Sequence, residues 1–286
     1  MGNAIKAKVL IAGCGYVGTP LARLLIEAGH TVFGLRRDPS KLPHSIIPVS
    51  TDLSRPLPDD LISSSLDAVV YTASATGRRE ESVYRAIYVD GPAHVLQWIK
   101  RNHPSCRRFV FASSTTVYGQ ADGSWVDEDS PGENPAFSGR LMREGEARVH
   151  AAPLSSVVVR FSGIYGPDRH RLIRQVADEE AWVPEDIRYL NHIHMEDCAG
   201  VLAHVLQLEH PAPLYLASDH EPAERVEVLR WIANELGRPL VAGASPARRP
   251  QSNKRCRNKR LLDSGYTFTY PSYREGYSEE IARYVR

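Results

Sequence analysis

Three glycines near the start of the chain have a spacing that indicates dinucleotide chemistry. Gly13, Gly15 and Gly18 form the pattern G-x-G-x-x-G directly after the apolar run 9–12. In such a loop the first glycine permits a tight turn, the second lets the backbone approach a pyrophosphate, and the third lets helix and strand pack closely. The pyrophosphate lies at the helix N-terminus, where free amides favour an anion. An ordinary glycine-rich turn that binds nothing is the alternative. The expected cofactor contacts in the loop are Gly13, Gly15, Tyr16, Val17 and Gly18.

The residues after the next expected strand indicate which dinucleotide binds. Arg36 and Arg37 stand where an NAD site has an acid for the ribose 2′-hydroxyl. A pair of guanidinium groups favours a 2′-phosphate, so the sequence predicts NADP, with NAD as the alternative cofactor and two solvated arginines as the alternative interpretation. We also expect cofactor contacts from Asp52, which follows the third strand and can instead be a turn residue, and from Ala73, which ends the fourth.

The elements that must position these residues alternate between strands and helices. Helical apolar spacing is found over 17–28, 83–99, 195–208 and 225–236. Short apolar runs predict strands at 9–12, 31–35, 46–49, 67–73, 108–112, 156–160 and 214–217. Strands separated by helices imply right-handed crossovers, which predict an α/β, doubly wound parallel Rossmann sheet.

The chain is expected to divide into a cofactor domain and a smaller substrate-binding lobe. We place the NAD(P)-binding domain at 1–166 and the C-terminal lobe mainly at 167–286, with 192–218 returning to the Rossmann sheet. The stretch 242–260 is rich in Pro, Ser, Asn and Arg and is expected to be a loop.

Composition excludes several classes of protein. The 286 residues are 42% hydrophobic and carry 35 basic against 34 acidic residues, which argues against disorder and against a globally basic nucleic-acid binder. No apolar run approaches the ~20 residues that span a bilayer, and residues 1–8 lack a signal-peptide core. The four cysteines form no C-x-x-C pair. We expect a cytoplasmic protein that acts on a small molecule, with neither nucleic acid nor membrane as partner.

Three further segments carry a family resemblance that extends over nearly the whole chain. The segments 111–119 (FASSTTVYG), 160–167 (RFSGIYGP) and 191–197 (NHIHMED) occur in order after the glycine loop. Together they resemble the extended short-chain dehydrogenase/reductase superfamily, in particular its nucleotide-sugar epimerase/dehydratase group. That resemblance implies a nicotinamide cofactor and a catalytic trio of a Tyr, a Lys four residues later, and a Ser or Thr.

The resemblance supplies the hydroxyl but not the Tyr–Lys pair. Ser114 occupies the Ser/Thr position, whereas 136–146 (AFSGRLMREGE) contains neither Tyr nor Lys in any register. The chain therefore resembles an atypical subgroup that keeps the NADP fold without the pair, and 258–276 also resembles members of that subgroup. Tyr118, four residues after Ser114, is the candidate for a replacement acid, with packing as its alternative role.

Candidate substrate contacts lie later in the chain. Arg169 and Arg171 follow the Gly-Pro step and could bind an anionic group. The resemblance implies that His194 lines the substrate pocket. His192 and His194 form H-x-H, but without a third His or Cys at ligand spacing, so we predict no metal site.

One basic segment stands out against the near-neutral total charge. Between residues 245 and 260 there are seven basic residues and no acid, while 122–133 holds five acids and no base. The basic segment could bind an anionic substrate or pair with the acidic stretch.

Two functions follow from these patterns. The first is an NADP-dependent oxidoreductase or epimerase/dehydratase-like enzyme that acts on a small polar or nucleotide-linked substrate, with Ser114 bonded to the reacting oxygen. The second is a non-catalytic NADP(H)-binding regulator or scaffold.

Overall fold

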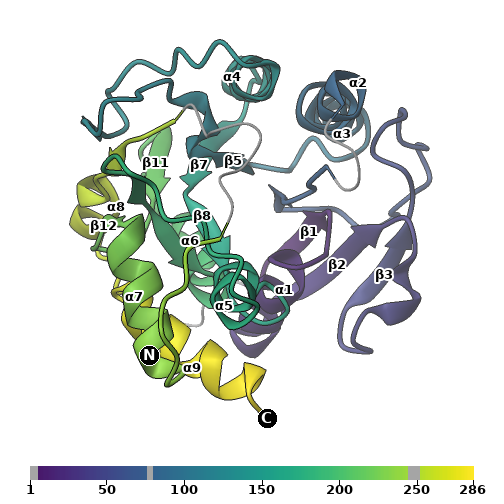
Figure 1. The fold of residues 1–286 in the computed structure, drawn as a ribbon. Helices are drawn as coiled ribbons and strands as arrows, with labels where there is room; N and C mark the ends of the chain where they lie inside the picture. Colours follow the sequence, from purple (N-terminus) through teal and green to yellow (C-terminus); the bar gives the residue numbers. More distant parts are fainter. Residues whose placement is uncertain (1–5, 76–79, 244–251) are drawn as a thin grey trace. The chain divides into compact units, whose positions relative to one another are not determined.

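A seven-stranded parallel sheet forms the centre of the cofactor-binding fold. The computed structural model describes residues 6–75, 80–243 and 252–286. The strands lie in the order β11-β7-β5-β4-β1-β2-β3 (Figure 1). Their bounds are β1 Lys8–Ala12, β2 Thr31–Arg36, β3 Ile47–Ser50, β4 Ala68–Tyr71, β5 Arg108–Ser114, β7 Ser155–Phe161 and β11 Leu214–Ala217. The chain runs outward from β1 to β3 and then returns to β4 on the other side of β1. This reversal is the doubly wound topology that the sequence predicts, and it is confirmed.

The strands are buried because their residues are apolar on both faces. β4, for example, is Ala-Val-Val-Tyr and is buried at every position. Helices cover both faces, as expected for a parallel sheet. In Figure 1, α2 (Glu81–Arg85), α3 (Gly91–Asn102) and α4 (Phe137–His150) lie together on one side, and α1 (Gly18–Glu27) lies on the other.

The helix expected over 83–99 is divided rather than continuous. A π-helical turn at Ala86–Asp90 separates α2 from α3. The Tyr71 hydroxyl donates to the Ile87 carbonyl oxygen at 2.6 Å, and a Cβ at Gly91 would lie 2.2 Å from that hydroxyl. Pro92, which has no amide hydrogen, lies in the first turn of α3. The division therefore follows from a buried tyrosine that the periodicity of the helix alone does not reveal.

The chain forms two compact units, each built from three separate segments. Unit 1 comprises 1–117, 132–160 and 199–215, and unit 2 comprises 118–131, 161–198 and 216–286. The boundary expected at residue 166 describes neither unit, because 118–131 belongs to unit 2. The expected return of the chain to the sheet corresponds to 199–215, which holds most of α6 (Met195–Gln207) and the start of β11.

Unit 2 consists of short strand pairs and helices around its own apolar core. The parallel pairs are β8 (Gly163–Tyr165) with β10 (His192–His194), and β6 (Trp125–Val126) with β13 (Arg255–Cys256). The antiparallel pair is β9 (Tyr189–Leu190) with β12 (Ala223–Glu224). The helices are α5 Arg171–Ala177, α7 Arg225–Glu235, α8 Lys259–Asp263 and α9 Tyr273–Tyr284. None of the helices in the described ranges is long and apolar enough to cross a membrane.

The expected loop at 242–260 is wrong over its second half. Arg255–Cys256 forms β13, and Lys259 begins α8. Backbone hydrogen bonds to residues 124 and 126 impose this order, and they depend on a partner segment far away in the sequence.

Candidate functional site

Gly13 makes the sharp turn that ends β1. Its φ of 95° lies in the left-handed region, and an added Cβ would lie 2.3 Å from the amide nitrogen of Ala73. The Gly13 amide donates to the Leu35 carbonyl oxygen at 2.9 Å, and the Thr72 hydroxyl donates to the Gly13 carbonyl oxygen at 3.0 Å. The structure thus places Ala73 directly against the loop, and no residue with a side chain can replace Gly13 without displacing it.

Gly15 and Gly18 have opposite environments. An added Cβ at Gly15 would meet just the Gly13 carbonyl oxygen, at 3.8 Å, so the space above this residue is open. An added Cβ at Gly18 would lie 2.9 Å from Ile11 Cγ2, which shows close contact between α1 and β1. Val17 is the N-cap of α1 and supplies no side-chain cap. The Thr19 amide donates to the Gly15 carbonyl oxygen at 2.9 Å and Pro20 has no amide hydrogen, which leaves the Gly18 amide as the first-turn donor for an anion among the described hydrogen bonds. The loop, which includes Tyr16, therefore fits a bound pyrophosphate.

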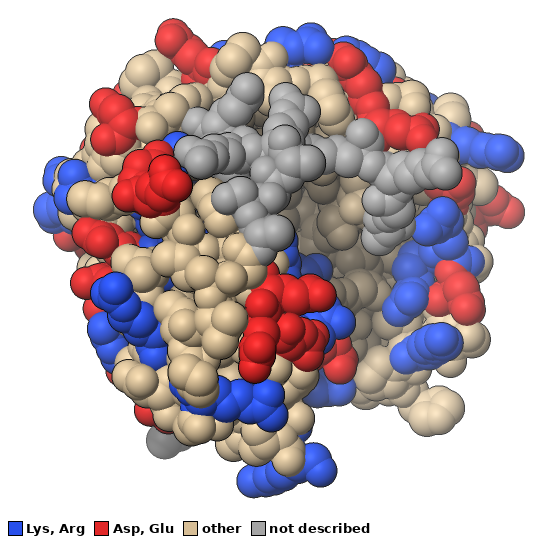
Figure 2. Space-filling view, viewed as in Figure 1, with Lys and Arg blue, Asp and Glu red and all other residues tan. Residues whose placement is uncertain are grey.

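The end of β2 carries two cations next to this loop. Arg36 is the last residue of β2 and is half-buried, while Arg37 is exposed. Among the described residues, neither has a carboxylate within 4.0 Å. The nearby Asp38 carboxylate accepts a hydrogen bond from the Ser40 amide at 3.0 Å and so caps the turn that follows β2. Figure 2 shows Lys and Arg side chains over the part of unit 1 where β2 and β3 lie. The two arginines are thus available for an anionic group.

Asp52 lies in a turn after β3. Its carboxylate accepts a hydrogen bond from the Ser54 amide at 3.0 Å, and this bond, together with the charge of Arg37, holds the pKa of Asp52 below its ordinary value. The carboxylate is therefore a permanent anion that orders the turn beside Arg37.

Ser114 ends β5 with its hydroxyl half-buried. The Thr116 amide donates to Ser114 Oγ at 3.1 Å, and the Thr116 hydroxyl lies 2.9 Å from the same atom. The Thr116 amide occupies an acceptor position of Ser114 Oγ, and either hydroxyl can be the donor in the contact between the two side chains.

Behind Ser114 lies a buried ionic network that the sequence analysis did not identify. Ser113 donates to the Glu146 carboxylate, and Arg160 binds the same carboxylate through Nε at 3.0 Å and Nη2 at 2.7 Å. Glu146 and Arg160 are 5% and 8% exposed, so both charges are removed from water. The network joins β5, α4 and β7 at the end of the sheet where Ser114 lies.

The helix expected to carry the Tyr–Lys pair carries neither residue. Within the segment where the resemblance places the pair, Ser138, Leu141 and Met142 are all buried in α4. Arg140 points to the surface and pairs with Glu81 at 2.9 Å. No other residue of α4 is a Tyr or a Lys.

Tyr118 is placed in unit 2 and is fully buried. Its hydroxyl donates to the Asp127 carbonyl oxygen at 2.6 Å. This bond engages the phenolic proton and anchors the segment that follows β5.

The two candidate arginines of unit 2 are exposed around the start of α5. Asp168, with φ 63°, and Gly166, with φ 140°, shape the turn that precedes them. The backbone amide of Arg169 donates a hydrogen bond to the Gly166 carbonyl oxygen at 3.0 Å, and Arg171 is the first residue of α5.

His194 lies in the interior of unit 2 rather than on a surface. Its Nδ1 accepts from the Glu196 amide at 3.3 Å, and its Nε2 is 3.6 Å from the buried Glu280 carboxylate. Burial lowers the pKa of His194, and the ring packs 3.9 Å from the Tyr270 ring, centroid to centroid. The imidazole therefore belongs to a packed cluster with α9. The described residues contain no group of three potential metal ligands.

Part of the basic segment pairs with the acidic stretch. Arg260 contacts the Asp129 carboxylate at 2.8 Å. The Arg255 guanidinium donates to the Gly123 carbonyl oxygen at 2.8 Å and lies 4.9 Å from the centroids of the Trp125 and Tyr189 rings. Structural pairing is therefore observed for these cations. Arg248 and Arg249 lie outside the described residues.

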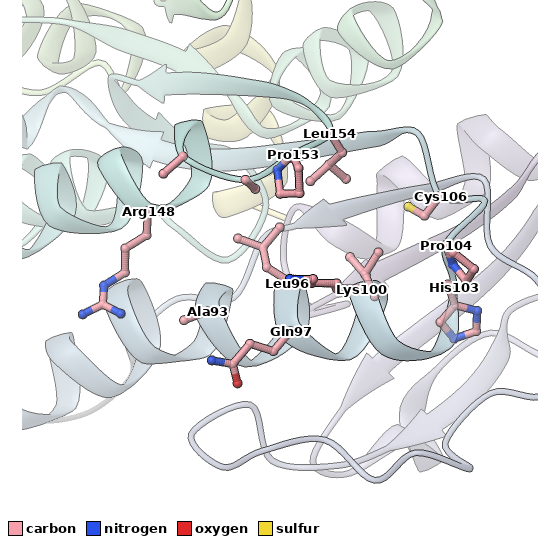
Figure 3. A pocket seen from close by; sticks show the side chains of 13 residues that line it. Ala93, Leu96, Gln97, Lys100, His103, Pro104, Cys106, Arg148, Pro153 and Leu154 are labelled. Atoms are coloured by element: carbon pink, nitrogen blue, oxygen red, sulfur yellow. The ribbon is translucent and has the colours of Figure 1, made fainter.

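An apolar groove of about 470 Å³ lies elsewhere on unit 1, beside α3 (Figure 3). Its lining includes Leu96, Pro153 and Leu154, with Lys100 and Arg148 among the charged residues. Cys106, at one end, precedes β5, whereas the glycine loop follows β1. Since parallel strands run in one direction, the groove and the loop lie at opposite ends of the sheet, and the groove is not the cofactor site.

Comparisons with known proteins agree with this geometry. The model of the "NAD dependent epimerase/dehydratase family" matches residues 9–213. Protein YeeZ of Escherichia coli K12 is 31% identical over 234 residues, which cover 77% of this chain and 80% of YeeZ. The 3-diazoavenalumate denitrifying reductase of a Streptomyces species is 26% identical over 96% of this chain and 100% of its own length. A solved structure from Methylobacillus flagellatus, titled as an NAD-dependent epimerase/dehydratase, is 37% identical with a TM-score of 0.81 and covers 98% of this chain and 99% of its own.

Proposed function

We propose, from the premise that this chain belongs to the NAD dependent epimerase/dehydratase family of extended short-chain dehydrogenases/reductases, that it is an NADP-dependent oxidoreductase. Its substrate would be a small polar or nucleotide-linked molecule. The observation that carries the proposal is the open glycine loop beside Arg36 and Arg37, neither of which has a carboxylate partner among the described residues. The full-length similarity to a reductase supports oxidoreductase chemistry.

Arg36 and Arg37 would hold the 2′-phosphate that distinguishes NADP from NAD. A charge-assisted hydrogen bond is worth about 1.5–3 kcal/mol, so the double change Arg36→Ala/Arg37→Ala should weaken NADPH binding by about tenfold to a hundredfold. NADH binding should not change. Arg101→Ala is the matched control, since Arg101 is an exposed arginine of unit 1 that pairs with Asp59. Isothermal titration of each variant measures both affinities. A wild-type protein that binds NADH more tightly than NADPH would overturn the assignment.

Ser114 would donate a hydrogen bond to the reacting oxygen of the substrate. When bound, the nicotinamide exchanges a hydride with substrate carbon. The Thr116 amide holds Ser114 Oγ in place, and burial of the Glu146–Arg160 pair keeps the end of β5 rigid. Loss of one such donor typically lowers kcat by about a hundredfold or more. We therefore expect this loss from Ser114→Ala and full activity from Ser105→Ala, an exposed serine before β5.

A second candidate function is an NADP(H)-binding regulator without catalysis. The specific observation in its favour is that α4 carries no Tyr or Lys and that the Tyr118 proton is engaged by Asp127. A panel of carbonyl compounds and nucleotide sugars separates the two functions. Turnover of NADPH that Ser114→Ala abolishes supports the enzyme, and tight NADPH binding without turnover of any compound supports the regulator.

A further inference from the structure

Lys254 is the one buried cation among the described residues of the basic segment, and no acidic group balances it. Arg260 pairs with Asp129, and Lys259 pairs with Asp263 at 2.7 Å. Lys254 is just 7% exposed, yet among the described residues no carboxylate lies within 4.0 Å of its ammonium group. Its one hydrogen bond runs from Nζ to Ser252 Oγ at 2.7 Å. A buried charge without a counter-ion is costly, so this position requires an explanation.

The alternation of side chains along β13 separates Lys254 from its basic neighbours. Arg255 points to the face that carries Trp125 and Tyr189. Because successive side chains of an extended strand point to opposite faces, Lys254 and Cys256 share the other face, where both are buried. Arg255 packs on the face that carries Trp125 and Tyr189, and Lys254 does not take part in that packing.

The backbone around Lys254 is fixed to two segments that carry the family motifs. On one side, the Asn253 amide donates to the Gln120 carbonyl oxygen at 3.0 Å, just after the V-Y-G step. On the other side, Asn191 donates to the Lys254 carbonyl oxygen at 2.9 Å and accepts from the Cys256 amide at 2.6 Å. Asn191 begins the N-H-I-H segment. Lys254 is therefore held with precision between these two segments, within unit 2.

We propose that Lys254 binds an anionic oxygen of the substrate, from a carboxylate or a phosphate group, with Ser252 beside it as a second donor. This inference rests on the proposed function, because it assigns the lysine to the substrate site of that enzyme. Burial lowers the pKa of Lys254, as expected for an ammonium group whose counter-ion arrives with the ligand. An arriving anion would favour the charged form and gain a hydrogen bond in a poorly solvated place.

Lysine side-chain NMR tests this directly, since the chain has few lysines. The six are Lys6, Lys8, Lys41, Lys100, Lys254 and Lys259. With ¹³C-labelled lysine, Lys254→Arg identifies the Lys254 signal, and inorganic pyrophosphate and acetate serve as probes for phosphate and carboxylate oxygens. We expect one or both probes at millimolar concentration to shift the Lys254 signal and to raise its titration midpoint. The probe that acts identifies the kind of anion. A Lys254 signal that responds to neither probe overturns the proposal.

Matched variants measure the contribution of the ammonium group to anion binding. Lys254→Met should weaken binding of the active probe at least about tenfold, while Lys259→Met, which removes an exposed lysine of the same segment, should leave it unchanged. Equal binding by Lys254→Met and wild type also overturns the proposal. NADPH affinity should be the same in all three proteins, because the glycine loop is in unit 1. A wild type that fails to bind NADPH contradicts the proposed function separately, and the Lys254 measurement is unaffected by that result.

Discussion

Replacing Arg160 by methionine would leave the Glu146 carboxylate buried without the two N–H donors of the guanidinium group. The carboxylate is 5% exposed and accepts from Arg160 at 3.0 and 2.7 Å, with Ser113 as its other partner in the network. Removing one member of a buried pair costs about 3–5 kcal/mol, since the remaining charge is neither solvated nor paired. Total stabilities are about 5–15 kcal/mol, so the variant should lose a large part of its free energy of unfolding.

The same helix supplies a control pair of opposite character. Arg140 and Glu81 also form a contact of 2.9 Å, but their side chains are 51% and 54% exposed. Exposed pairs contribute about 0–1 kcal/mol because water screens both charges. Arg140→Met should therefore change the free energy of unfolding by less than about 1 kcal/mol. The difference between the two variants isolates the effect of burial, because the chemistry of the pairs is the same.

Urea unfolding followed by circular dichroism provides the measurement, and a double variant completes it. The double variant Arg160→Met/Glu146→Leu removes both charges. It should therefore lose less free energy of unfolding than the two single variants lose together. If Arg160→Met does not fold, Glu146→Gln, which keeps an acceptor for Ser113, takes its place in the cycle. A loss for Arg160→Met no greater than that for Arg140→Met would refute the argument that burial makes this network strong.

Three further predictions concern single positions. Burial raises the pKa of Asp219, so its stabilising contribution is complete below the unfolded carboxyl value of about 3.9 and decreases as the pH rises. Asp219→Asn should therefore gain stability relative to wild type in urea melts as the pH rises above about 4. Gly13→Ala should lower the melting temperature, because Gly13 has a positive φ. Gly15→Ala should keep the wild-type melting temperature but weaken NADPH binding. A stable Gly13→Ala together with a destabilised Gly15→Ala that keeps its NADPH affinity would contradict the assigned roles. Gly276→Ala should destabilise unit 2, because the new Cβ would lie 1.9 Å from the Tyr165 hydroxyl, and an unchanged thermal unfolding curve would show that this contact yields easily.

Elements that depend on short, local sequence patterns are predicted well. The glycine loop, the strands at 31–35 and 214–217 and the helix at 225–236 are all found within a few residues of their expected ends. In each of them, local apolar spacing and the glycine positions carry the structural information. Ser114 and the missing Tyr–Lys pair could be located for the same reason, since both follow from short motifs.

Features that depend on distant partners could not be predicted in this way. The division between α2 and α3 requires the Tyr71 hydroxyl, and the Glu146–Arg160 pair joins a helix to a strand. A signal for the second existed, because Arg160 ends the apolar run 157–159, and an arginine in a buried strand needs an acidic partner. Lys254 was one of seven cations in the basic segment 245–260, and its burial is what distinguishes it.

The pairing of β6 with β13 determines when unit 2 can form during synthesis. The bond from Arg255 to Gly123 joins residues 132 positions apart, and 118–131 leaves the ribosome long before its partner. Until Arg255 is translated, the backbone groups of β6 lack their intramolecular partners. Closing so long a loop is slow compared with local folding, and the exposed Trp125 remains accessible to chaperones during that interval. The segment that carries Lys254 and the later helix α9 are thus both needed before unit 2 is complete.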